Sequence, residues 1–212
     1  MRHIKWLKSF LIIIFVFVIG GTGWAESEDS KYVKWYKTPI RYKYISIEVI
    51  TKCLGGVVNW SYHYCPIDEQ KIIFENNRKN IKKEINSSSP KDYLTLDEFE
   101  SFLDEKIIKY FGPSRKVLDC EISGVTFYEN KNGKIFFEVY YYCGGNCAQC
   151  EYYELYNEEG QLIATDRERR YLDSRTKKFA KVVNTYRSIK KKLGLNEKKS
   201  KSFDIYLEGG KQ

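Results

Sequence analysis

Four short segments between residues 116 and 166 constrain the fold of this chain more than any other feature of its sequence. Each segment is rich in Val, Ile, Phe and Tyr, and turn-forming residues such as Asn132-Gly133 and Asn157-Glu158-Glu159-Gly160 separate them. β-branched and aromatic residues favour strands, and Asn-Gly favours tight hairpin turns. The sequence therefore predicts a four-stranded antiparallel meander.

An N-terminal hairpin is expected ahead of this meander. Residues 41–51 and 57–64 alternate apolar and polar side chains, and Gly55-Gly56 lies between them. Such alternation is typical of strands that bury one face, and a glycine pair between two of them indicates a hairpin turn.

Two or three helices are expected beside the strands. Apolar residues recur at helical spacing in residues 69–85, 95–112 and 174–193. The second segment is the clearest, because Thr95 and Glu98 have the spacing of a capping box at its start. Helices that stand apart from a run of hairpins indicate an α+β fold, with an antiparallel sheet packed against the helices.

The N-terminus has the composition of a secretory signal. Arg2, Lys5 and Lys8 precede an apolar run at residues 10–19, and small residues stand at the −3 and −1 positions of a cut after Ala25. The apolar run is short for a spanning helix, which needs about 20 residues. We therefore expect a signal peptide over residues 1–25, cleavage after Ala25, and a periplasmic or secreted protein.

The mature chain is expected to form one domain. Residues 26–40 are polar and predict a flexible lead-in, residues 41–195 form the α+β domain, and residues 196–212 form a loosely ordered basic tail. Within that tail, residues 203–207 could add an edge strand.

The net charge of +8 at pH 7 is unevenly distributed, because 15 basic but only 6 acidic residues lie from Thr165 onward. Membrane contact is predicted only through an uncleaved signal or through a basic C-terminal helix, which could contact anionic lipid. A solvated helix face is the simpler interpretation. Export argues against a nucleic-acid partner, and the sequence does not predict an oligomeric state.

Six cysteines in an exported chain predict structural disulfides. They are Cys53, Cys65, Cys120, Cys143, Cys147 and Cys150. A tight turn at Gly55-Gly56 would separate the first two by about 23 Å along a strand, too far for a disulfide, so they can pair only if the segment is bent.

The other four cysteines are expected to form one cluster. Pairing across the Asn132-Gly133 hairpin brings Cys120 to the mouth of the loop that holds Cys143, Cys147 and Cys150. The sequence leaves open which of the three pairs with Cys120.

Two other chemistries are open to this cluster, and they define the alternative function. Four thiolates at a hairpin tip could bind zinc, and Cys147 with Cys150 forms the C-x-x-C motif of thiol–disulfide exchange. The redox interpretation lacks a helix N-terminus and an adjacent positive charge, and an oxidising compartment competes with zinc for the thiols. Structural disulfides are the preferred interpretation.

Catalytic chemistry finds little support. His63 is the only histidine after the signal, and it lies in an alternating segment that predicts a strand. The chain has no G-x-S-x-G, no H-E-x-x-H and no glycine-rich phosphate loop. No catalytic residue, metal or cofactor is predicted.

Aromatic residues beside the cysteine loop are the best candidates for a binding surface. Tyr140, Tyr142, Tyr152 and Tyr156 are expected to form an exposed face there. Tyrosine rings offer a large contact area at low entropic cost. We therefore expect a non-enzymatic protein that binds another envelope or secreted protein.

Overall fold

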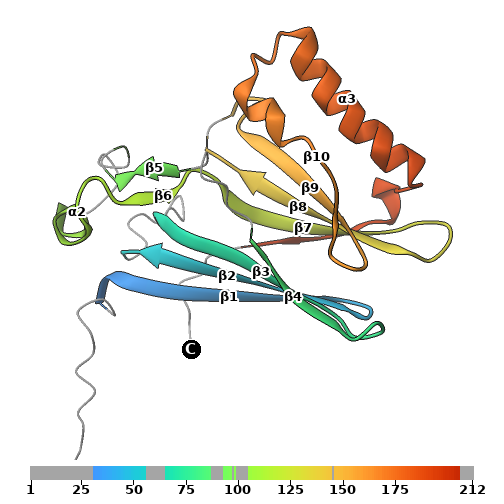
Figure 1. The fold of residues 1–212 in the computed structure, drawn as a ribbon, viewed down its shortest axis with the longest axis horizontal. Coiled ribbons are helices and arrows are strands. Elements are labelled where there is room, and N and C mark those ends of the chain that lie inside the picture. Colours follow the sequence, from blue (N-terminus) through green and yellow to red (C-terminus); the bar gives the residue numbers. More distant parts are fainter. Residues whose placement is uncertain are drawn as a thin grey trace, which may run out of the picture.

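The structure is a computed structural model that describes residues 31–55, 65–86, 93–96, 98, 105–144 and 146–205. Within these residues the chain forms two larger antiparallel sheets, a short two-stranded ladder and the helices α2 and α3. The expected α+β class is confirmed. Figure 1 shows the two larger sheets facing each other, with α3 on the far side of the second sheet.

The first sheet has the strand order β1-β2-β3-β4. Its strands are β1 Val33–Tyr42, β2 Ile45–Leu54, β3 Ile67–Asn76 and β4 Ile81–Asn86. In β2 the side chains of Ile45, Ile47 and Val49 are buried and those between them are partly exposed, as the alternating sequence predicts.

The prediction of a helix over residues 69–85 is wrong, because this segment forms the β3–β4 hairpin. Its few apolar residues fit strand alternation as well as helical spacing, and Ile72 and Phe74 point into the core. The turn is set by Asn76, whose Oδ1 accepts hydrogen bonds from the backbone N–H groups of Arg78 and Lys79 at 3.0 and 3.1 Å. Asn80 then adopts φ +52°, a conformation that asparagine tolerates.

The expected hairpin across Gly55-Gly56 is also wrong, because β2 pairs with β1 along one edge and with β3 along the other. Residues 57–64, which include His63, lie outside the described residues. The lead-in was expected to be flexible to residue 40, whereas β1 begins at Val33.

The second sheet has the order β10-β9-β8-β7-β11. Its strands are β7 Glu121–Glu129, β8 Ile135–Tyr142, β9 Glu151–Asn157, β10 Leu162–Thr165 and β11 Lys201–Asp204. The predicted meander is therefore confirmed as β7 to β10. β11 lies in the segment that was expected to be a loosely ordered tail, and it adds an edge strand beside β7.

The core lies between the two sheets. Phe74 of β3 stacks on Phe137 of β8 with ring centroids 5.3 Å apart, and Phe137 stacks on Tyr156 of β9 at 4.9 Å. Gln70 ties the sheets together with polar bonds: its Nε2 donates to Thr51 at 2.9 Å and its Oε1 accepts from the Ile122 N–H at 2.6 Å. Burying a polar side chain with both groups satisfied avoids a desolvation cost and fixes the position of the sheets.

A small ladder and a short helix occupy one end of the sheets. Its strands are β5 Tyr93–Thr95 and β6 Lys116–Leu118, and α2 spans Glu105–Phe111. The backbone N–H and hydroxyl of Thr95 donate to Glu98 at 2.7 and 3.0 Å, which is half of the predicted capping box. The helix expected over residues 95–112 is observed only as α2, and its expected start is wrong because Thr95 belongs to β5. Residues 97 and 99–104 lie outside the description.

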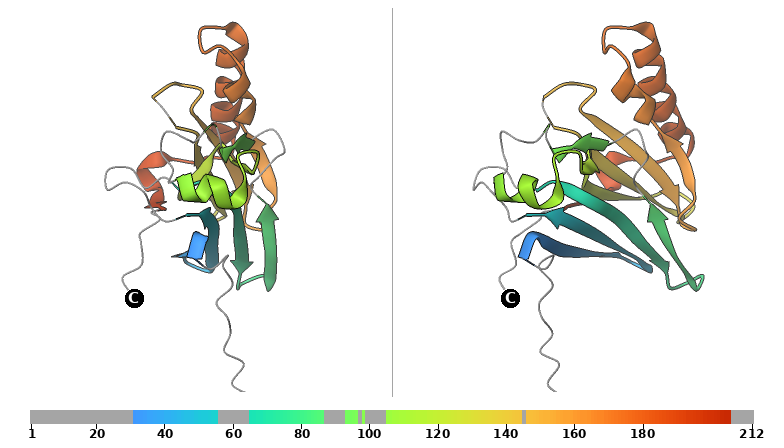
Figure 2. Two further views of the ribbon diagram at one scale, coloured as in Figure 1. Left: turned by 90° about the vertical axis from the view of Figure 1, so that its left-hand side faces the viewer. Right: turned by 60° about the vertical axis from the view of Figure 1, so that its left-hand side comes forward.

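Helix α3, Lys177–Lys192, covers the outer face of the second sheet, where the sequence predicted a helix. Thr176 caps its start by accepting from the Phe179 N–H at 3.2 Å. Gly194 follows its end with φ +72°. The 3-10 helix η2, Arg167–Tyr171, leads into α3, and the 3-10 helix η3, Glu197–Lys199, follows it. Figure 2 shows the resulting order of first sheet, second sheet and α3.

None of the helices in the described part of the chain is long and apolar enough to cross a membrane. The predicted signal peptide lies outside the described residues.

Candidate functional site

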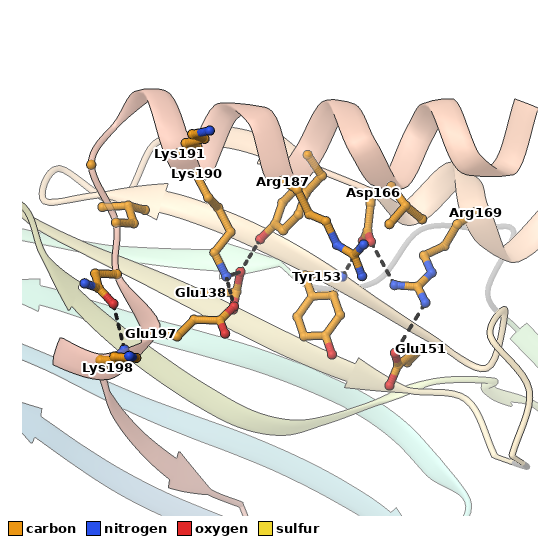
Figure 3. Close-up of a pocket in the computed structure, with 15 residues that line it drawn as sticks. Glu138, Glu151, Tyr153, Asp166, Arg169, Arg187, Lys190, Lys191, Glu197 and Lys198 are labelled. Atoms are coloured by element: carbon orange, nitrogen blue, oxygen red, sulfur yellow. Dashed lines mark hydrogen bonds and ion pairs between the residues drawn. The ribbon is translucent and has the colours of Figure 1, made fainter.

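A cleft of about 790 Å³ lies between α3 and the outer face of the second sheet (Figure 3). Strands β8 and β9 form its floor, α3 lines its opposite side, η2 stands at one end and residues 194–198 stand at the other. Its charged and tyrosine side chains are Glu138, Glu151, Tyr153, Asp166, Arg169, Tyr186, Arg187, Lys190, Lys191, Glu197 and Lys198.

One end of the cleft is organised around Glu138, whose side chain is only 6% exposed. Its carboxylate accepts hydrogen bonds from the hydroxyls of Tyr128 at 2.8 Å and Tyr186 at 2.6 Å. Lys190 Nζ lies 2.9 Å from Glu138 Oε2. Burial, and then the Glu138 charge, raises the pKa of both tyrosines well above the usual value, so their hydroxyls stay protonated and donate.

The other end is organised around Asp166, which is 1% exposed. It accepts from the Tyr153 backbone N–H at 2.7 Å and from Arg169 Nη1 at 2.9 Å. Burial raises the pKa of Asp166, and these two hydrogen bonds oppose that shift. Arg169 also reaches Glu151 at 3.3 Å, so one buried guanidinium neutralises two carboxylates.

Tyr153 lies on the floor between the two ends. Its ring stacks on the rings of Tyr140 and Tyr186, and the centroid-to-centroid distances are 5.3 and 6.2 Å. Burial raises the pKa of its hydroxyl, which therefore remains a donor. Across the described residues that hydroxyl makes no hydrogen bond, so it is available to a ligand.

The rim of the cleft carries three basic side chains, Arg187, Lys191 and Lys198. Arg187, Lys191 and Lys198 take part in none of the ion pairs formed among residues that the structure describes. The carboxylates of the floor, by contrast, are already paired with Lys190 or Arg169. With Glu197 on the rim, the lining carries five basic and four acidic side chains, so the charge that the cleft offers to a ligand is net positive by one.

The four tyrosines proposed as one binding face are divided between two faces of the sheet. Tyr152 and Tyr156 are 1% and 4% exposed and pack in the core between the sheets. Tyr140 and Tyr142 are half-buried on the outer face, where they line a hollow of about 400 Å³ next to the cysteine loop. A binding role for these two remains a prediction.

The strand register explains this division. Tyr140 pairs with Tyr153 and Tyr141 pairs with Tyr152, and directly opposed residues point to the same side of a sheet. Tyr153 therefore shares the outer face with Tyr140. Tyr153 was not among the residues predicted from the sequence, although counting the register inward from Cys143 and Cys150 would have found it.

The cysteines form three disulfides, Cys53–Cys65, Cys120–Cys143 and Cys147–Cys150, with Cα separations of 5.5, 4.0 and 5.1 Å. The expected cluster of four is present, and Cys143 is the partner of Cys120. A bulge between Ile122 and Gly124 adjusts the β7–β8 register next to this bond. Three disulfides indicate an oxidising, exported environment.

The zinc alternative is not supported, because all six sulfur atoms are in disulfides. No Lys, Arg or His adjoins the C-x-x-C motif in sequence, but the fold brings a positive charge to it. Arg169 of η2 donates from Nε and Nη2 to the carbonyl of Ala148, between Cys147 and Cys150, at 3.0 and 2.6 Å. This contact joins segments that are distant in sequence, so the local motif could not indicate it.

Comparison with known proteins finds no family model, no curated protein and no solved structure that matches this chain. The geometry of the cleft is the basis for the function proposed below.

Proposed function

We propose that this chain is an exported, disulfide-stabilised binding protein of the cell envelope, with its ligand site in the cleft beneath α3. The observation that carries this proposal is the combination of a polar cleft of about 790 Å³ with basic rim residues that have no acidic partner within the described parts of the chain. Export through cleavage after Ala25 is part of the proposal, and the three disulfides support it.

The ligand we propose is an acidic peptide segment of another envelope or secreted protein. Figure 3 places Lys191 and Lys198 at the end of the cleft opposite Arg169, with Arg187 between them. Positive charges spread along a cleft match a ligand that carries several carboxylates along its length. Arg187 can engage a carboxylate with two parallel hydrogen bonds.

The rest of the cleft supports binding through a fixed geometry. Glu138 and Asp166 each accept several hydrogen bonds from side chains or backbone on different elements, which holds β8, β9, η2 and α3 in place. A preorganised site loses less entropy when a ligand binds. The Tyr153 hydroxyl adds a donor on the floor.

Titration with a hexaglutamate peptide by isothermal calorimetry tests the proposal. The double substitution Arg187→Ala with Lys191→Ala should weaken binding by about tenfold or more, since a hydrogen bond to a charged group is worth roughly 1.5–3 kcal/mol. The matched control is Lys181→Ala with Lys192→Ala, which removes the same charge from exposed positions of α3 outside the cleft.

The control pair should change the affinity by about twofold at most, because exposed charges act weakly through screened electrostatics. Equal losses from both pairs, or no binding by the unmodified protein, would contradict a specific site in the cleft.

A further inference from the structure

The three disulfides differ in their exposure to solvent. Cys53, Cys65 and Cys120 are 0%, 4% and 6% exposed, so each of the first two disulfides contains at least one buried cysteine. In the third, Cys147 is exposed and Cys150 is half-buried. Thiol–disulfide exchange requires that a thiolate reach a sulfur, so the third disulfide is the accessible one.

The third disulfide also closes the shortest loop. Its cysteines are 3 residues apart, compared with 12 and 23 for the other two. Because the constraint that a cross-link places on the unfolded chain grows with loop length, this bond stabilises the fold least. Reducing it would leave the longer cross-links and the core in place.

Arg169 connects this disulfide loop to the cleft. Its guanidinium holds the Ala148 carbonyl with two hydrogen bonds, at 3.0 and 2.6 Å, and holds Asp166 at 2.9 Å and Glu151 at 3.3 Å. The side chain of Arg169 is 9% exposed, so little water competes for these bonds. A change in the Cys147–Cys150 loop therefore acts directly on a residue that lines the cleft.

We propose that Cys147–Cys150 is an exchangeable disulfide that holds the η2 end of the cleft in place when oxidised and loosens it when reduced. The reaction partner is a dithiol, such as the reduced C-x-x-C of another exported protein. The exchange itself is independent of the ligand, whereas its effect on ligand binding rests on the function proposed above.

The exchange proceeds in two steps. A thiolate of the dithiol attacks Cys147 Sγ, the Cys147–Cys150 bond breaks, and Cys150 leaves as a thiolate. The second thiol of the partner then attacks the mixed disulfide and releases Cys147. Two electrons pass from the dithiol, which becomes a disulfide, to the protein, whose two thiolates take up the protons that the partner loses.

Reduction removes the covalent closure of the loop that presents the Ala148 carbonyl. In the oxidised loop the Cys150 N–H donates to the Cys147 carbonyl at 3.0 Å and the Cys143 N–H donates to the Cys150 carbonyl at 2.8 Å. Without the cross-link, this turn can open, and Arg169 loses its carbonyl acceptor. Residues 166–171, which Arg169 anchors, should then exchange their amide hydrogens faster.

Graded reduction of the intact protein tests the proposal without any ligand. Samples are equilibrated with rising concentrations of dithiothreitol, alkylated and mapped by mass spectrometry, and a parallel set is analysed by hydrogen exchange. Cys147 and Cys150 should be alkylated at a concentration about tenfold or more below that needed for the other four cysteines. At that concentration, exchange in residues 146–151 and 166–171 should rise while β7 stays protected.

The proposal is overturned if the three disulfides are reduced together, if another disulfide is reduced first, or if exchange in residues 166–171 is unchanged when Cys147 and Cys150 are free. Two variants serve as controls. Cys147→Ser with Cys150→Ser should show the exchange pattern of the reduced protein under oxidising conditions. Arg169→Lys keeps the charge but cannot make the two parallel bonds, and it should raise exchange at residues 166–171 even with the disulfide closed.

Because neither readout uses a ligand, failure of peptide binding and failure of the disulfide switch give separate results. If hexaglutamate binds the oxidised protein, its affinity should fall by about fivefold or more on selective reduction, since the η2 end of the cleft is no longer held.

Discussion

Lys190 Nζ lies 2.9 Å from Glu138 Oε2, which joins α3 to the strand at the centre of the second sheet. Both side chains are largely removed from water, at 14% and 6% exposed. The pair stabilises the position of α3 over the cleft, because each charge would be costly to bury without the other.

Lys190→Met should therefore destabilise the protein, because it leaves the Glu138 carboxylate buried without its cation. Breaking a buried ion pair by removing one partner costs about 3–5 kcal/mol, and partial exposure places this site near the lower end. Lys192→Met, at an exposed position of the same helix, should change the free energy of unfolding by about 0.5 kcal/mol at most. Urea unfolding of both variants measures this, and equal stabilities would contradict the role of the pair.

The two tyrosine hydroxyls that face the cleft should separate binding from stability. Tyr153→Phe removes a hydroxyl without a protein partner among the described residues, so stability should be unchanged while hexaglutamate binding weakens by about threefold to tenfold. Tyr186→Phe removes a donor to the buried Glu138 and should lower the free energy of unfolding by about 1–3 kcal/mol. A loss of stability in Tyr153→Phe, with Tyr186→Phe as stable as the unmodified protein, would show that Tyr153 has a structural role.

Glu121 should make stability depend on pH. Burial raises the pKa of its carboxyl from the ordinary 4.5 to about 7, and a hydrogen bond from Ser123 opposes the shift. Between these two pH values the native state holds a proton that the unfolded chain has lost, so stability falls as pH rises through this window and levels off above it.

Glu121→Gln should remove this dependence. The difference in the free energy of unfolding between the variant and the unmodified protein should grow from pH 4.5 to about pH 7 in favour of the variant, reaching about 1–3 kcal/mol. Urea unfolding at four pH values measures the difference, in which the contributions of other buried carboxylates cancel. A difference that is constant with pH would contradict the shifted pKa.

Asn76 should be the most sensitive position of the β3–β4 turn. Its Nδ2 donates to the Glu158 carbonyl at 2.6 Å and its Oδ1 accepts the two turn N–H groups, so one side chain joins both sheets. Asn76→Ala should cost about 2–3 kcal/mol because the buried Asn76 side chain makes three hydrogen bonds that alanine cannot make, whereas the exposed neighbour Asn77 should tolerate alanine. Thermal unfolding compares the two variants, and similar losses would contradict the assigned contacts.

Elements with local sequence signals were predicted correctly, whereas structure that depends on contacts between distant segments was not. The meander from β7 to β10 and helix α3 were predictable because turn residues, strand alternation and an amphipathic stripe are local signals. Hairpin register predicted that Cys120 lies beside the cysteine loop, but it left open which of the three cysteines is its partner. The segment at 69–85 was misassigned because its thin apolar pattern fits either period, and the pairing of β2 with β1 and β3 decided the outcome.

The candidate site was harder to predict. Glu138, Asp166 and Arg187 come from β8, the start of η2 and α3, and only the packing of α3 on the sheet brings them to one cleft. Arg169 meets the cysteine loop for the same reason. A single sequence shows the charges of these residues but contains no signal for which of them end up paired.

The most direct test of the account is the NMR titration of the isotope-labelled, oxidised protein with hexaglutamate. Residues 151–153 and 183–198 line or adjoin the cleft, and their amide signals should shift in a saturable manner. Signals of the first sheet, β1 to β4, should remain in place. Shifts confined to the exposed side of α3 or to the first sheet, or no shifts at all, would contradict a ligand site beneath α3.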